Sequence, residues 1–263
     1  ILQVKNLSKQ FGGVKATDDL SFDIKYGEIC AIIGPNGSGK TTAINMITGV
    51  LKPTSGKIMY EDKDLTTLSR PEISRLGVTR TFQNLRLWDT LSVLEHVLAA
   101  RYCRTYSNFF SSVFRSRPAI HEEKENMKFS LELLEMVGLD NMEDVMANSL
   151  PYGKRRLLEI ARALAIEPKL LLLDEPAAGM SSAEINDLIQ LIFDIRDKGI
   201  SVVVVEHRMK VVMNASDKIV VLNYGRKIAE GTAEEIRGNK QVIEAYLGTA
   251  YSKEITEVEA CQQ

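Results

Sequence analysis

The sequence predicts an α/β fold with a parallel sheet, an antiparallel β part and a helical insertion. Short apolar runs alternate with helical stretches, as parallel strands alternate with crossover helices. These runs are Glu28–Ile33, Leu170–Leu173, Val202–Val205 and Lys218–Leu222. Between about Val93 and Leu164 strand signals vanish, which indicates that a helical lobe is inserted between strands of the sheet.

The elements can be placed in order along the chain. The N-terminal part is rich in short strand candidates, which are Ile1–Lys5, Leu20–Ile24 and Lys57–Tyr60. We expect turns between them at Gly12-Gly13 and Thr54-Ser55-Gly56. The predicted helices are Thr41–Thr48, Ser92–Arg101, Glu122–Val137, Lys154–Ala165 and Ser182–Lys198. Gly138 and Gly199 follow two of these helices and are typical helix ends.

The composition indicates one domain and disfavours binding to nucleic acids. We expect an α/β core with its β part in residues 1–92 and 165–248, a helical part in 93–164 and a frayed polar tail in 249–263. The formal net charge of −2 disfavours a nucleic-acid surface. No apolar run approaches the ~20 residues of a membrane span. Cys30, Cys103 and Cys261 lack metal-ligand spacing and are expected to be free thiols in a reducing compartment.

A phosphate-binding loop lies between a strand and a helix near the N-terminus. The run GPNGSGKT fits the pattern G-x-x-x-x-G-K-[ST], in which backbone N–H groups surround phosphate oxygens. The helix that follows adds its dipole to the same anion site. A glycine-rich turn without a ligand is the alternative, which the flanking strand and helix disfavour. The predicted nucleotide-binding residues here are Gly34, Pro35, Asn36, Gly37, Ser38, Gly39, Lys40, Thr41 and Thr42.

Acidic and histidine side chains follow two other apolar strands. In KLLLLDEP, Asp174 is placed to hold Mg²⁺ together with the Thr41 hydroxyl, and Glu175 is placed as general base for water. His207 follows Val202–Val205 and faces the crevice where ligands bind in open α/β sheets. The alternatives are a solvated strand end for the two acids and a structural role for the histidine.

With these motifs, the chain resembles the ATP-binding subunits of ABC transporters over nearly its whole length. The resemblance implies a RecA-like P-loop NTPase core that binds ATP and Mg²⁺. It also implies that Phe11 in KQFGGVKA stacks on adenine, although a core role is the alternative for this residue. Gln83 in TRTFQNLRLW matches the glutamine that contacts Mg²⁺. Glu175 matches the catalytic glutamate, and His207 matches the histidine that contacts the γ-phosphate.

The signature motif of that family, usually LSGGQ, is altered in this chain. The matching run is LPYGK, in which Pro151 replaces the serine and Tyr152 replaces a glycine, while Gly153 is kept. The resemblance implies that this run covers the γ-phosphate of ATP held by the opposite subunit. Pro151 removes a hydroxyl and an N–H, so we expect a weakened cap. Lys154 either offsets this loss or is merely solvated. In a second departure, Ser181 stands where the family has an aspartate.

These departures are similar to those of one subfamily. The runs DEPAAGM and QVIEAYLG and the YG form of the signature resemble the ATP-binding proteins of branched-chain amino-acid importers, as does the extra helical stretch between Arg101 and Glu122. Importers of urea or short amides share much of this pattern. Soluble ABC ATPases such as assembly factors and, less readily, a P-loop kinase are alternatives from other classes.

The resemblance also implies partners and a location. We expect a second ATPase subunit, a copy or a paralogue, paired head to tail with two ATP molecules between the subunits. Membrane permease subunits are expected to dock near Gln83–Thr90, with Arg86 and Trp88 as candidate contacts, although plain packing is the alternative for Trp88. The chain is then peripheral at the cytoplasmic face of the membrane and never touches the solute. The aromatic cluster between Tyr102 and Phe114 forms either a small core or a partner surface; its members are Tyr102, Tyr106, Phe109, Phe110 and Phe114.

Overall fold

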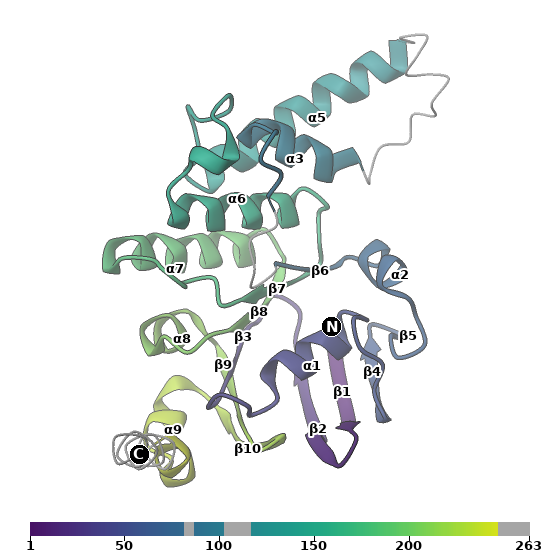
Figure 1. The fold of residues 1–263 in the computed structure, drawn as a ribbon, viewed down its shortest axis with the longest axis vertical. Helices are drawn as coiled ribbons and strands as arrows, with labels where there is room; N and C mark the ends of the chain where they lie inside the picture. Colours follow the sequence, from purple (N-terminus) through teal and green to yellow (C-terminus); the bar gives the residue numbers. More distant parts are fainter. Residues whose placement is uncertain (82–86, 103–116, 247–263) are drawn as a thin grey trace, which may run out of the picture.

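The computed structural model describes residues 1–81, 87–102 and 117–246, and it contains two sheets (Figure 1). The first is a four-stranded sheet in the order β2-β1-β4-β5, and the second is a six-stranded sheet in the order β10-β9-β3-β8-β7-β6. The strands are β1 Leu2–Phe11, β2 Val14–Ile24, β3 Ile29–Ile33, β4 Ser55–Tyr60, β5 Lys63–Asp64, β6 Val78–Arg80, β7 Leu170–Asp174, β8 Ser201–Val205, β9 Lys218–Asn223 and β10 Arg226–Gly231. The predicted α/β fold with an antiparallel β part is confirmed.

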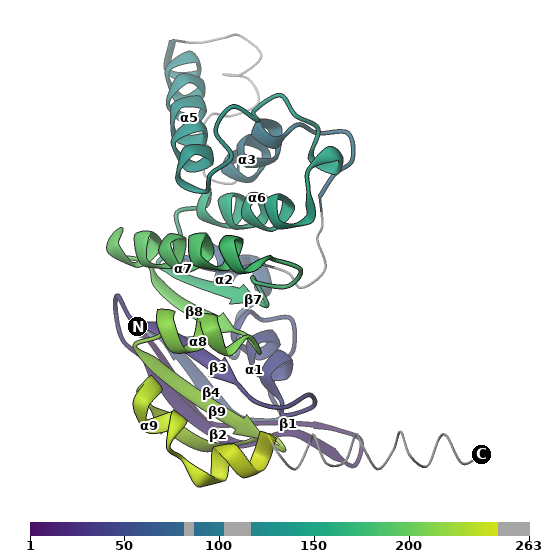
Figure 2. The ribbon, with the colours of Figure 1, turned by 90° about the vertical axis from the view of Figure 1, so that its left-hand side faces the viewer.

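Helices cover the six-stranded sheet and extend beyond it (Figures 1 and 2). The longer helices are α1 Lys40–Ile47, α3 Val93–Arg101, α5 Arg117–Met136, α6 Tyr152–Leu164 and α7 Ser182–Asp197. The shorter ones are α2 Arg70–Arg75, α8 Met209–Ala215, α9 Ala233–Arg237 and the 3₁₀ turn Ala147–Ser149. Helices α3, α5 and α6 pack together at one end of the molecule, as expected for the helical insertion.

Three strands at the centre are buried on both faces, which explains why they pair in parallel. Every residue of β3, β7 and β8 is buried. Along β7 and β8, Leu171, Leu173, Val202 and Val204 face one core, which they share with α6 and α7. The alternate residues face a second core, shared with α1 and the N-terminal sheet. Near-continuous apolar runs are typical of such doubly covered parallel strands.

The prediction of a turn at Thr54-Ser55-Gly56 is wrong, because Ser55 and Gly56 begin β4. Gly56 has φ of +91°, and an added Cβ would lie 2.3 Å from the carbonyl oxygen of Asn6. The pairing of β1 with β4 shifts register between Lys5 and Ser8, opposite this glycine. A glycine in a strand can mark a close backbone approach at a bulge as well as a turn.

The glycine after α5 ends that helix in the expected way. Gly138 has φ of +71°, its N–H donates to the carbonyl of Glu135, and the N–H of Leu139 donates to that of Leu134. These two hydrogen bonds form a Schellman motif, which satisfies carbonyls that the helix leaves unpaired. No heavy atom lies within 4 Å of the Cβ that an alanine would place there.

These two glycines give a matched test of local backbone strain. We expect Gly138→Ala to lower the free energy of unfolding by about 1 kcal/mol, because the cost is the left-handed conformation alone. Gly56→Ala should cost more, because the new methyl group also collides with the β1 backbone. Thermal and urea unfolding of both variants test this, and equal losses would contradict the close approach at Gly56.

Candidate nucleotide-binding and hydrolysis site

The phosphate loop connects β3 to α1 and is enclosed by neighbouring backbone. A Cβ at Gly34 would lie 2.1 Å from the carbonyl oxygen of Leu222 in β9, and a Cβ at Gly39 would lie 2.4 Å from that of Ala16 in β2. The N–H of Gly225 donates to the carbonyl of Ser38 at 3.0 Å. Gly34 and Gly39 are therefore required by the backbone of β9 and β2, which presses on the loop. Asn36, Gly37 and Thr41 stay exposed.

Lys40 folds back over the loop. Its Nζ donates to the carbonyl oxygens of Gly34 at 2.7 Å and Pro35 at 2.9 Å, with a long contact of 3.5 Å to the Ser38 hydroxyl. Burial lowers the pKa of Lys40, while the charges of Glu175 and Asp174 act in the opposite direction. The ammonium group thus lies in the field of both acids, although 134 or more residues separate them in sequence. The N–H groups of the Lys40 ammonium are the donors from which a phosphate oxygen would accept hydrogen bonds.

The two acids occupy different environments at the end of β7. The side chain of Asp174 is 3% exposed, and its Oδ2 accepts a hydrogen bond from Nη2 of Arg80 at 2.5 Å. Glu175 is half-buried and adopts φ of +49°. Its N–H continues the pairing with β8 by donating to the carbonyl of Val205 at 2.8 Å. A left-handed conformation costs a non-glycine residue energy, and such strain is concentrated at functional sites.

The carboxyl end of β8 presents His207 to solvent and buries Glu206. The His207 side chain is 58% exposed, whereas the Glu206 side chain is fully buried. Oε1 of Glu206 accepts the N–H of Ala177 at 2.8 Å, and Oε2 accepts the N–H groups of His207 and Arg208, each at 3.0 Å. Arg208 also donates from Nη1 to the carbonyl of Met180 at 3.0 Å. Glu206 and Arg208 thus tie the segment after Glu175 to the histidine segment.

Glu206 was not among the predicted site residues. Its sequence signal is a single acid after a fully apolar strand, which cannot be distinguished from a solvated strand end. Three backbone N–H groups stabilise the buried charge, as buried charges require. The carboxylate therefore positions two functional segments at once.

The signature run lies at the start of α6. Pro151 is the N-cap residue of this helix, and its side chain makes no capping hydrogen bond. The Tyr152 hydroxyl accepts a hydrogen bond from Nη2 of Arg156 at 2.9 Å, and its ring touches Gly179, where a Cβ would lie 2.7 Å from Cδ1. Gly153 is buried, and its Cβ would lie 2.4 Å from Oε1 of Glu184. Lys154 is partly buried, with Nζ 3.4 Å from Sδ of Met142.

The remaining predicted residues differ in how the structure places them. Phe11 ends β1 and is 48% exposed, so its alternative role as a core residue is wrong. Gln83 and Arg86 lie outside the described residues, as do Cys103, Cys261 and the cluster residues other than Tyr102, which is 71% exposed. Cys30 is buried and free.

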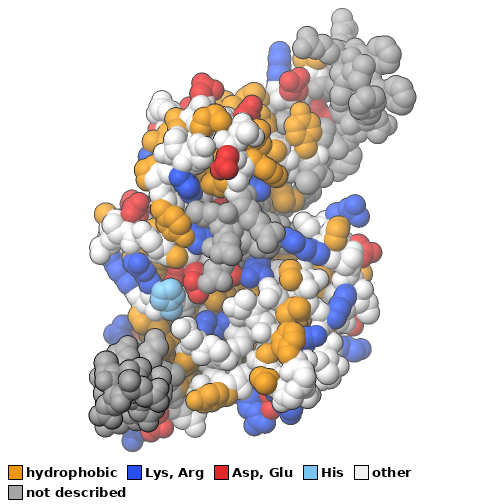
Figure 3. Space-filling model, in the orientation of Figure 1, with side chains coloured by type: hydrophobic (Ala, Val, Ile, Leu, Met, Phe, Trp, Pro, Cys, Tyr) orange, Lys and Arg blue, Asp and Glu red, His pale blue; other side chains and the backbone are white. Residues whose placement is uncertain are grey.

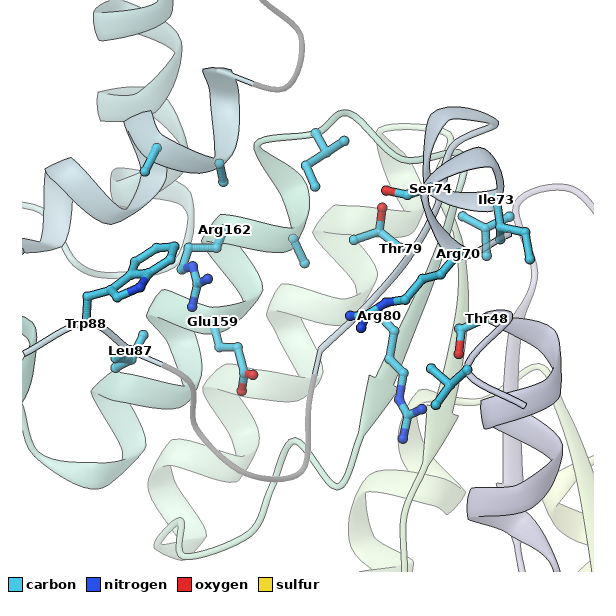
Figure 4. A pocket seen from close by; sticks show the side chains of 16 residues that line it. Thr48, Arg70, Ile73, Ser74, Thr79, Arg80, Leu87, Trp88, Glu159 and Arg162 are labelled. Atoms are coloured by element: carbon cyan, nitrogen blue, oxygen red, sulfur yellow. The ribbon is translucent and has the colours of Figure 1, made fainter. Parts of the chain in front are cut away.

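A cavity of about 530 Å³ lies between the helical part and the core (Figure 4). Trp88 forms part of its wall. The backbone N–H of Trp88 donates to Nε2 of His96 at 2.9 Å, and the Arg162 guanidinium lies 4.9 Å from the centroid of the Trp88 ring. Nδ1 of His96 lies 2.8 Å from the carbonyl oxygen of Ser92. The hollow is visible in the space-filling view between the helical part and α2 (Figure 3).

The residues present fit Mg²⁺ that is bound together with a nucleotide. Thr41 and Asp174 offer hydroxyl and carboxylate oxygens, the ligands that this hard cation prefers. In the described ranges, no group of three or more His, Cys, Asp or Glu residues could hold a metal alone. This combination suits an ion that keeps several waters and takes other ligands from substrate phosphates. In the same described part of the chain, no helix combines the length and apolar character needed to cross a membrane.

Known proteins resemble this chain over nearly its whole length. The family model "ABC transporter" matches residues 17–178, and the model "Branched-chain amino acid ATP-binding cassette transporter" matches residues 226–252. The chain is 41% identical to the high-affinity branched-chain amino acid transport ATP-binding protein BraF of Pseudomonas aeruginosa over 251 residues, 95% of this chain and 98% of the relative. It is 40% identical to the corresponding LivG of Escherichia coli, with the same coverage.

Solved structures give the same result. The ADP conformation of an ATP-binding cassette of an ABC transporter superposes with a TM-score of 0.82 at 35% identity, covering 94% of this chain and 98% of the other. A dimeric cassette in a post-hydrolysis state, bound to ADP and phosphate, gives a TM-score of 0.76 at 28% identity, covering 89% and 99%.

The chain belongs to the ABC transporter family. Within this family it falls in the subfamily of branched-chain amino-acid transport ATP-binding proteins, and it is an ABC transporter ATPase. The family prediction is therefore confirmed, and cassettes of this family bind adenine nucleotides, form dimers and associate with transporter complexes. The individual site residues remain predictions.

The buried carboxylate gives the first functional test. Glu206→Gln keeps the shape of the side chain but places an N–H donor against the N–H of Ala177 or of His207 and Arg208. An unsatisfied buried donor costs about 1–3 kcal/mol, and a misplacement of about 1 Å can cost up to about 100-fold in rate. We expect kcat for ATP to fall at least about tenfold with little change in KM. Glu132→Gln on the exposed face of α5 is the control, and equal kcat values for the two variants would exclude a positioning role for Glu206.

Proposed function

We propose that this chain is the ATP-hydrolysing subunit of an importer for branched-chain amino acids. The observation that carries the proposal is that the phosphate loop with Lys40 and the acids Asp174 and Glu175 lie at the carboxyl ends of β3 and β7, which belong to one parallel part of the sheet. The relatives named above, which are alike over nearly their whole length, supply the substrate class. This full-length similarity favours branched-chain amino acids over urea or amides, and a transporter over a soluble assembly factor.

Different residues of the site act on different parts of ATP and on the attacking water. Phe11, exposed at the end of β1, stacks on the adenine ring. Lys40 exchanges its loop carbonyls for β- and γ-phosphate oxygens, and Glu175 accepts a proton from the attacking water. His207 steadies the γ-phosphate from the exposed end of β8. Thr41, Asp174 and Gln83 would hold Mg²⁺, which would supply positive charge against the phosphate oxygens.

A complete site needs two subunits. In both ribbon views, α7 and the six-stranded sheet lie between α6, which carries the signature run, and α1, which carries the phosphate loop (Figures 1 and 2). The signature run therefore does not cover the phosphate loop of its own chain. Two subunits pair head to tail, so that Pro151, Tyr152 and Gly153 of one subunit close over the ATP held by the other. The second subunit is a copy of this chain or a paralogue.

The cavity beside Trp88 receives a permease subunit. It lies where the helical part meets the core, and its apolar walls are interrupted by Arg70, Arg80, Arg162 and Glu159 (Figure 4). Trp88 is 51% exposed and offers a large contact surface. This docking holds the subunit peripherally at the cytoplasmic face of the membrane, away from the transported solute.

Glu175→Gln tests the hydrolytic role. The variant keeps the size of the side chain but cannot accept the proton, so we expect kcat to fall at least about 100-fold. ATP binding should persist and trap the closed pair, which size-exclusion chromatography with ATP and Mg²⁺ detects. Normal turnover in this variant would remove Glu175 from the role of base.

Uptake of labelled leucine tests the transport role. Cells that lack this subunit should lose uptake, wild-type protein should restore it, and Glu175→Gln should not. The Glu132→Gln control should restore uptake like the wild type. Unimpaired uptake in the deletion strain would overturn the assignment to branched-chain amino acids.

A further inference from the structure

Arg80 lies between the cavity and the acidic end of β7, and no motif of the sequence assigned it a role. It is the last residue of β6, and it pairs with Leu172 of β7. Its side chain is 8% exposed. Arg80 also lines the cavity, on the same side as Thr48 (Figure 4).

The guanidinium group joins two other elements. Nη2 donates to Oδ2 of Asp174 at 2.5 Å, and Nη1 donates to Oδ1 of Asn45 at 2.5 Å. The fixed fork of an arginine can hold two acceptors in a defined relation, which a lysine ammonium cannot. Because both charges are buried, solvent screens this pair only weakly.

The residue that follows β6 holds the backbone of the same aspartate. The N–H of Asp174 donates to Oγ1 of Thr81 at 3.1 Å. Two consecutive residues, Arg80 and Thr81, therefore fix both the main chain and the carboxylate of Asp174. The pairing uses one carboxylate oxygen, Oδ2, and no other described side chain donates to Oδ1.

Asn45 lies four residues after Thr41 on α1, so the two share a face of that helix. Thr41 and Asp174 come from different elements, α1 and β7, and Arg80 is in contact with both elements. Its two hydrogen bonds thereby set the relative position of the helix that carries the hydroxyl and the strand that carries the carboxylate.

We propose that Arg80 is a positioning residue for Asp174, which it aligns with α1 through Asn45 so that Oδ1 is presented to nucleotide-bound Mg²⁺. This inference rests on the proposed function, in which Asp174 and Thr41 hold that ion. Because Arg80 also lines the cavity, a change in the cavity wall can reach the carboxylate through a single side chain.

The test compares nucleotide affinity with and without the metal ion. Dissociation constants of a non-hydrolysable ATP analogue are measured by calorimetry, once in excess EDTA and once in excess MgCl₂. Loss of a residue that orients a metal ligand typically costs about 10- to 100-fold in metal affinity. For Arg80→Met we expect the gain in affinity from Mg²⁺ to shrink about tenfold, with the affinity in EDTA unchanged. Arg80→Lys keeps the charge but not the fork, and it should show a smaller loss in the same direction, as should Asn45→Ala.

Two further variants serve as the negative and the positive control. Arg75→Met makes the same chemical change at an exposed position of α2 and should match the wild type. Asp174→Asn should abolish most of the Mg²⁺-dependent gain, and if it does not, the metal role within the proposed function fails. With Asp174→Asn behaving as expected, an unchanged gain in the Arg80 variants overturns the inference. Tighter binding of the analogue by an Arg80 variant than by the wild type in MgCl₂ also overturns the inference. An equal loss of affinity in EDTA and in MgCl₂ does so too.

Discussion

Burial of three parallel strands on both faces is the constraint on which the site depends. Strands β3, β7 and β8 have no exposed residue, and the alternate side chains of β7 and β8 enter two separate cores. A shift of one residue would exchange the two sets of side chains between the cores, so the register is strongly specified. Because the strands are parallel, their carboxyl ends lie at one edge. The phosphate loop, Asp174, Glu175 and His207 all follow from this one arrangement.

Hydrogen bonds to the buried charges of Glu206 and Arg80 then fix the positions of groups that the strands bring close together. Glu206 holds the N–H groups of Ala177, His207 and Arg208, and Arg80 holds the side chains of Asp174 and Asn45. In a low-dielectric interior such bonds are strong when complete and costly when incomplete. A substitution at either position therefore changes the position of functional groups as well as stability.

The sequence predicted the parts of the fold whose signals are long or specific. The central strands were clear because four or five apolar residues in succession have few other interpretations, and the phosphate loop was clear because glycine, lysine and threonine stand at required spacings. Helix α2, with six residues, and strand β6, with three, were missed because each spans fewer than two periods of its amphipathic pattern. Gly56 was misread because close backbone approach and turns demand the same residue. Arg80 and Glu206 were missed because their roles depend on partners 94 and 29 residues away.

Ser181, which stands where the family has an aspartate, has a local role in the structure. Ser181 is the N-cap of α7: its N–H donates to Oε2 of Glu184 at 2.8 Å, and its hydroxyl accepts the N–H of Glu184 at 3.4 Å. The residues before it are held as well, Ala177 by Glu206, Gly179 by the Tyr152 ring and Met180 by Arg208. The segment between Glu175 and α7 is thus in contact with the signature run of the same chain. A displacement of α6 can therefore reach Glu175 through packing and backbone hydrogen bonds, without an aspartate at position 181.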